Sequence, residues 1–180
     1  MELFIYLFAA LFSVLNPIGT VPIFVALTEG YTSAERAKVS LITSINVLII
    51  LLISFFIGQY VLSFFGITIT ALRIAGGIII TSSGFGLLNG NFSKNKGINK
   101  KVQKEVQNRT HIALTPLAMP MLAGPGSISL LIAYYQEHNT TSEIIISTIS
   151  ITVVAATIYL VLRSAHFLAK LLVDLALYQS

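Results

Sequence analysis

The sequence predicts an all-α protein, a polytopic bundle of about five transmembrane helices. Of its 180 residues, 55% are hydrophobic and only 10% are charged, and the mean hydropathy is +0.85. Soluble domains carry about 25% charged residues, so this chain lacks the polar surface that water requires. The remaining observation is the placement of the charges, which leaves five long stretches without any. A soluble fold is therefore not expected.

Each uncharged stretch is long enough to be a membrane span, because about 20 apolar residues in a helix cross a bilayer core of about 30 Å. The second stretch is too long for one span. Gly58 and Gly66 predict that its helix ends at about Ile57 and that an outer hairpin follows. The stretches are Leu3 to Thr28, Val39 to Leu72, Ile74 to Ser93, Ile112 to Gln136 and Ile144 to Leu162.

Lysine and arginine are distributed unevenly along the chain. If the spans alternate in direction, ten of the eleven fall on one face of the membrane, and only Arg73 falls on the other. The positive-inside rule makes the ten-residue face cytoplasmic and places the N-terminus outside. The basic loop at 94–109 is therefore expected in the cytoplasm. Its neighbourhood contains a single aromatic residue, Phe92, so the expected partner is the lipid bilayer and not nucleic acid.

All five prolines lie in the first and fourth spans, which they interrupt. A proline removes a backbone N–H and costs about 3 kcal/mol in a helix interior. Backbone groups freed at membrane depth must line a cavity, and paired interrupted helices are typical of inverted-repeat transporters with a central site. The predicted substrate-binding residues are Asn16, Pro17, Gly19 and Thr20 in the first span and Gly124, Pro125, Gly126 and Ser127 in the fourth.

Several side chains near the breaks have two interpretations. Asn16 either caps the helix that follows it or contacts a substrate. Thr20 and Ser127 are expected to bond back to a carbonyl one turn earlier in preference to donating into the gap. As supporting residues, Asn46 is expected to bond to another span, and Arg73 either extends to the outer interface or attracts a carboxylate from outside. Close helix packing is predicted at Gly76, Gly77, Gly84 and Gly86.

The motifs at the two breaks resemble the signatures of the MarC family of bacterial inner-membrane proteins. They read Asn16-Pro-Ile-Gly-Thr-Val-Pro-Ile-Phe and Pro116-Leu-Ala-Met-Pro-Met-Leu-Ala-Gly-Pro-Gly-Ser-Ile, and Arg73-Ile-Ala-Gly-Gly is similar as well. The resemblance runs from about residue 1 to 170. It implies location in the bacterial inner (plasma) membrane and six helices in two inverted three-helix repeats. For members of the SnatA type, it implies transport of small neutral amino acids such as glycine and alanine.

The resemblance also defines the expected domain organisation. One transmembrane domain, 1–180, holds repeat one at about 1–90, the basic loop at about 91–110 and repeat two at about 111–180. The family continues into a sixth helix, whereas this sequence ends after a segment in which His166, Lys170 and Asp174 recur at helical spacing. The last helix is therefore expected to be missing or replaced by a short interfacial tail. Either activity is impaired, or a partner in a homo-oligomer closes the pocket.

Two functions follow from these observations. The first is a transporter of small neutral amino acids with its site between the broken spans. The alternative is a non-transporting membrane scaffold or accessory subunit. An enzyme is not expected, because the spans contain no acidic residue and the chain contains no cysteine. The sequence accordingly predicts no catalytic residue, no metal site and no cofactor.

Overall fold

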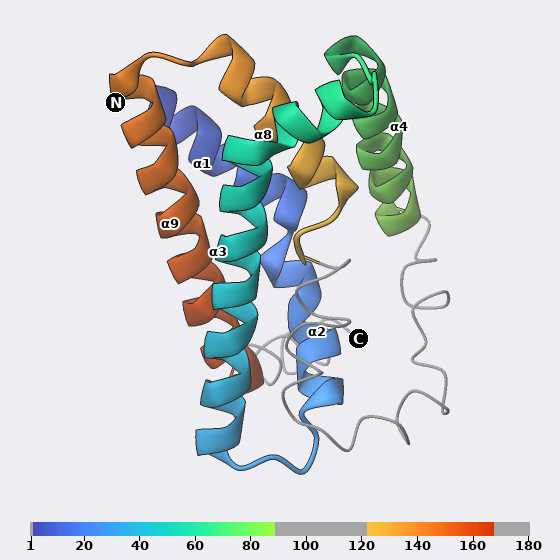
Figure 1. The fold of residues 1–180 in the computed structure, drawn as a ribbon. Coiled ribbons are helices and arrows are strands. Elements are labelled where there is room, and N and C mark those ends of the chain that lie inside the picture. The colour runs from blue at the N-terminus through green and yellow to red at the C-terminus, as the bar shows by residue number, and fades with distance from the viewer. Residues whose placement is uncertain (1, 89–121, 168–180) are drawn as a thin grey trace.

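The computed structural model describes residues 2–88 and 122–167, and every element within these ranges is a helix (Figure 1). The basic loop, the C-terminal tail from 168 and the fourth span up to residue 121 lie outside the described residues. The helices are α1 (Glu2–Leu15), α2 (Pro17–Leu27), α3 (Ser33–Phe64), α4 (Ile69–Leu88), α8 (Pro125–Glu137) and α9 (Thr141–Arg163).

Three of the predicted spans are helices long and apolar enough to cross a membrane: Glu2–Leu27, Ser33–Phe64 and Thr141–Arg163. The apolar part of the third predicted span is shorter and covers Ile69–Ser82. Of the fourth predicted span, the described part is α8. The all-helical membrane class is thus confirmed.

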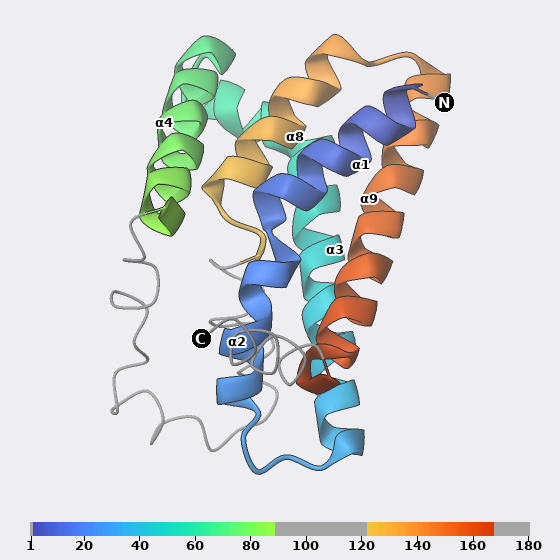
Figure 2. The same ribbon diagram turned by 180° about the vertical axis from the view of Figure 1, so that it is seen from behind.

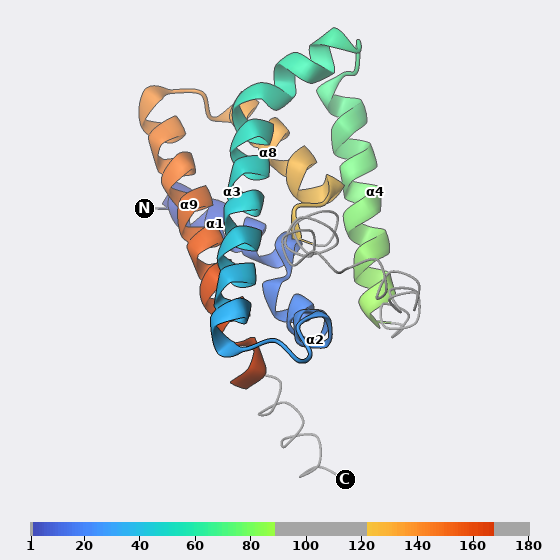
Figure 3. The same ribbon diagram turned by 60° about the horizontal axis from the view of Figure 1, so that its bottom comes forward.

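The helices form a bundle in which α3 packs on both α9 and α8, and α4 packs on α8 (Figure 3). Helix α1 lies across the other side of α9, as the view from behind shows (Figure 2). Leucines four residues apart on α1 face inward, because that spacing places them on one side of a helix. The buried core combines Leu7, Leu11 and Leu15 of α1 with Val47, Leu51 and Phe55 of α3 and Ile151, Val154 and Ile158 of α9.

The outer surface of the bundle carries many large apolar side chains. On α3, large aliphatic side chains recur every four residues and are each about half exposed: Leu41, Ile45, Ile49, Ile53 and Ile57. A continuous exposed stripe of this kind is unfavourable in water and favourable against lipid tails. The outward faces therefore provide the surface that a bilayer covers.

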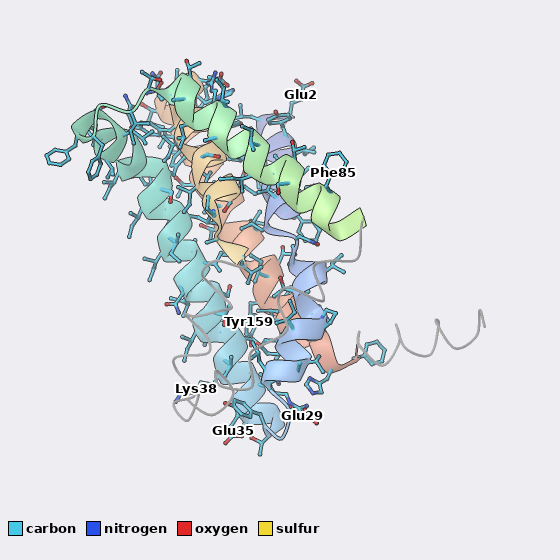
Figure 4. The ribbon with its side chains drawn as sticks, turned by 90° about the vertical axis from the view of Figure 1, so that its right-hand side faces the viewer. Glu2, Glu29, Glu35, Lys38, Phe85 and Tyr159 are labelled. Carbon is cyan, nitrogen blue, oxygen red and sulfur yellow. The ribbon has the colours of Figure 1, made fainter. Side chains whose placement is uncertain are left out.

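Charged groups gather at the two ends of the bundle. Glu29, Glu35 and Lys38 lie at one end, and Glu2 lies at the other (Figure 4). The end of α9 returns to the first of these ends, since Nη1 of Arg163 donates to the carbonyl oxygen of Ser33 over 3.0 Å. This arrangement agrees with spans that alternate in direction.

The prediction that the second helix ends at about Ile57 is wrong. Helix α3 continues to Phe64, and the turn comes at Gly66, whose φ is 66°. Gly58 instead lies buried inside α3, six residues before its end, where the side chain of Ile132 in α8 occupies the space that a Cβ would need. Gly58 therefore permits close approach of two helices and does not end one.

The adjacent glycines of α4 differ in their surroundings. A Cβ on Gly76 would overlap Oγ of Ser129 in α8 and lie 2.8 Å from its Cβ. A Cβ on Gly77 would have nothing within 4 Å. The prediction of close packing is therefore confirmed for Gly76 and wrong for Gly77. The surroundings of Gly84 and Gly86 lie outside the described part of the structure.

Substituting these two glycines separately tests the α4–α8 contact. Gly76→Ala is expected to destabilise the protein by about 1–3 kcal/mol, because the helices must move apart. Gly77→Ala, its matched control, should be neutral or stabilising by up to about 1 kcal/mol, because alanine favours helix over glycine. Reversible unfolding in mixed detergent micelles measures both. Equal effects of the two substitutions would contradict the close approach.

Candidate functional site

The first predicted break is present at the predicted residues. Helix α1 ends at Leu15, and Asn16 adopts the left-handed conformation with φ 45° and ψ 59° before α2 begins at Pro17. The N–H of Asn16 still donates to the carbonyl of Phe12 over 3.1 Å. The carbonyl of Ser13 has no helical donor, because Pro17, four residues later, lacks an N–H. The end of α1 thus presents backbone oxygen atoms at the break.

The side chain of Asn16 caps α2. The side-chain Oδ1 accepts from the N–H of Gly19 over 3.1 Å. The backbone carbonyl of Asn16 accepts from Oγ1 of Thr20 over 3.2 Å. The capping interpretation of Asn16 and the backward bond of Thr20 are therefore both confirmed. Gly19 is required here, since a Cβ would overlap the Asn16 amide. Because the cap uses Oδ1, the amide nitrogen Nδ2 is the part of Asn16 suited to donate to a ligand.

The second break precedes α8. Gly124 is the N-cap residue in an extended conformation and Pro125 is the first helical residue, so the N-cap residue of α8 provides no side-chain cap. Ser127 is buried, and its Oγ donates back to the carbonyl of Gly124 over 2.9 Å. The expected backward bond is confirmed, although it reaches three residues instead of four. The first turn of α8 therefore begins with N–H groups, those of Gly126 and Ser127, that its own N-cap residue does not satisfy.

The structure brings the two breaks together. A Cβ built on Gly126 would lie 3.4 Å from Cγ1 of Val14, which is two residues before Asn16. Helices α2 and α8 lead from this region toward opposite ends of the bundle (Figure 2). Both N-termini, with their partial positive charge, therefore face the same middle region, as does the C-terminal end of α1 with its partial negative charge.

The two halves of the chain repeat the same local features. Helices α2 and α8 each begin with a proline, after the N-cap residues Asn16 and Gly124. The N-cap residues of α3 and α9 are Thr32 and Thr140. The distance along the sequence between the two members is the same in both pairs. At both of these later helix starts, a glutamate three residues on accepts from the N-cap N–H, at 2.9 and 3.1 Å. Two consecutive helix starts thus recur in the same register.

The two supporting residues lie on α3 and α4. Asn46 is half-buried in α3, and its bond to another span stays a prediction. Nη2 of Arg73 forms an ion pair with Oε1 of Glu137 over 2.6 Å, joining the start of α4 to the end of α8. Both side chains are about half exposed, at 47% and 57%, so the pair contributes little stability, about 0–1 kcal/mol. The pairing with Glu137 was not foreseen.

Sequence reasoning also missed three residues beside the start of α8. They are Val14, Ile80 and Ser129, which contact the backbone of α8 or of α4 at Gly126 and Gly76. Only Ser129 is polar, and its Oγ bonds back to the carbonyl of Gly126 over 3.0 Å. No sequence signal distinguishes Val14 or Ile80 from the many other aliphatic residues of the spans.

The left-handed conformation of Asn16 predicts that glycine is more stable than alanine at this position, the reverse of their order within a helix. In an uninterrupted helix, glycine is about 1 kcal/mol less stable than alanine. At Asn16, alanine must adopt a left-handed conformation that costs about 1–2 kcal/mol, whereas glycine adopts it freely. Asn16→Ala should therefore unfold more readily than Asn16→Gly in detergent titrations. The reverse order would show that the helix is continuous at this residue.

The comparisons with known proteins agree on one family. The model of "MarC family integral membrane protein" matches residues 1–177. A UPF0056 membrane protein of Buchnera aphidicola subsp. Schizaphis graminum is 39% identical over 171 residues, 95% of this chain and 79% of that protein. YhcE, a UPF0056 membrane protein of Escherichia coli K12, is 35% identical over 165 residues, 92% of this chain and 76% of that protein.

A further relative bears the family's own name. The UPF0056 inner membrane protein MarC of Escherichia coli is 41% identical over 124 residues, 66% of this chain and 55% of that protein. No solved structure matches the chain. The family match confirms the resemblance seen at the two broken helices. The protein belongs to the MarC family of integral membrane proteins.

Proposed function

We propose that this protein transports small neutral amino acids across the bacterial inner membrane, with the solute bound between the α1–α2 break and the start of α8. The observation that carries the proposal is the close approach of Gly126 to Val14, which places two interrupted helices against each other. Interrupted helices that meet in this way are the usual construction of transporter sites, because freed backbone groups need a polar partner at membrane depth.

The groups at the breaks suit both ends of an amino acid. A carboxylate accepts hydrogen bonds from the uncapped N–H groups of Gly126 and Ser127 and from Nδ2 of Asn16. An ammonium group donates to the carbonyl oxygens at the end of α1, including that of Ser13. A zwitterion without a charged side chain leaves no net charge in the site, which fits spans without acidic residues.

The matching helix starts support two inverted repeats. If α2 and α8 are equivalent, and α3 and α9 are equivalent, the equal spacing of their N-caps follows directly. The opposite directions of α2 and α8 in the bundle are those that inversion requires (Figure 2). Inversion also explains how two helix N-termini come to face one central site.

Uptake by proteoliposomes tests the function. The purified protein in vesicles should accumulate radiolabelled glycine and alanine above protein-free vesicles. Asn16→Gly keeps the left-handed backbone but removes the Nδ2 donor, so uptake should fall about tenfold or more, as expected for one lost hydrogen bond to a charged group. Thr32→Ala is the matched control, because it also removes a helix cap, at the start of α3 and away from the breaks.

The outcomes separate the candidate functions. Glycine uptake that falls with Asn16→Gly and survives Thr32→Ala supports the transporter. Absence of uptake by the unmodified protein, together with a stable partner in detergent pull-downs, would instead favour the scaffold or accessory subunit. Equal losses in the two variants would indicate a stability effect and count against a site at Asn16.

Orientation has its own test, because the chain has no native cysteine. Lys38→Cys and Asn139→Cys place single thiols at opposite ends of the bundle. With positive residues inside, an impermeant maleimide should label position 139 in intact spheroplasts and position 38 only after permeabilisation. Labelling with the opposite sidedness would overturn the proposed topology.

A further inference from the structure

We infer that Ile80 and Val14 form a size filter over the first turn of α8, which restricts the transported amino acid to those with small side chains. The inference rests on the proposed function and adds the residues that determine its specificity. These two aliphatic side chains come from different helices, α4 and α1, and meet at a single backbone position, Gly126.

The space beside Gly126 is narrow. A Cβ at this position would lie 2.9 Å from Cγ1 of Ile80 and 3.4 Å from Cγ1 of Val14. Gly126 itself is buried, whereas Val14 is half-buried and Ile80 remains 38% exposed. The two aliphatic side chains therefore border the start of α8 from the edge of the core. Little room is left beside its first N–H groups.

The position of Ile80 is fixed by contacts one turn away. Gly76, four residues before Ile80 on the same face of α4, lies against Ser129, three residues after Gly126 on α8. Oγ of Ser129 in turn donates to the carbonyl of Gly126 over 3.0 Å. This antiparallel pair of contacts sets the register of α4 on α8, so that Ile80 must lie over Gly126.

A bound amino acid would meet this pair directly. With its carboxylate on the N–H groups of Gly126 and Ser127, its α-carbon substituent has Val14 and Ile80 as apolar neighbours. A hydrogen atom or a methyl group needs little space there, whereas a branched side chain must displace one of the two. Each methylene in such a pocket discriminates by about 10–200-fold.

Uptake by proteoliposomes of the full chain, with labelled glycine and valine measured side by side, tests the filter. Ile80→Ala should raise the valine-to-glycine uptake ratio about tenfold or more, because it removes the larger of the two side chains. Val14→Ala opens the same space from α1 and is made in parallel, so that a ratio is obtained even if one variant folds poorly. Ile78→Ala is the matched control, since Ile78 is 64% exposed on the same helix.

A complementary pair of variants reverses the effect. Gly126→Ala should abolish glycine uptake, because its methyl group takes the remaining space, and Ile80→Ala added to it should restore uptake. An unchanged valine-to-glycine ratio in Ile80→Ala and Val14→Ala, with glycine uptake intact, would overturn the filter alone. Absence of glycine and alanine uptake by the unmodified protein would overturn the proposed function and the filter with it.

Discussion

Every backbone N–H and carbonyl in the bilayer core must find a partner, and the two broken helices of this chain are organised by that requirement. At the first break, Asn16 satisfies part of the need with its own side chain, while the proline after it removes the helical donor of one α1 carbonyl. At the second, the N-cap residue Gly124 has no side chain with which to cap α8. The packing of α4 and α1 around Gly126 then determines how much room remains for anything that could complete the bonding.

The sequence was sufficient for features that depend on local chemistry. Uncharged length predicted the spans, and the proline at position 17 predicted the break, because a missing N–H acts wherever the residue lies. The backward bonds of Thr20 and Ser127 were likewise predictable, since each hydroxyl has a carbonyl one turn away. The failures involve partners distant in the chain. Gly58 was predicted to end a helix, whereas it lies inside α3 against Ile132 of α8.

The same distinction explains what was missed at the candidate site. Asn16, Thr20 and Ser127 were found because prolines mark the two breaks beside them. Ile80 could not be singled out, because it is one of many aliphatic residues and its role depends on the register of α4 against α8. The ion pair of Arg73 could not be predicted for the same reason, because its partner, Glu137, belongs to a helix whose orientation is determined by tertiary packing.

The threonine–glutamate caps of α3 and α9 have a consequence for how the chain is assembled. Each cap uses residues within a single turn, Thr32 with Glu35 and Thr140 with Glu143, so it needs no other helix in order to form. The starting points of these two long helices are therefore specified at insertion, before any tertiary contact. The interrupted helices lack that independence at α8, whose first turn acquires its surroundings only when α1 and α4 dock. During membrane insertion, α3 and α9 should accordingly form first, and the region around the two breaks should form last.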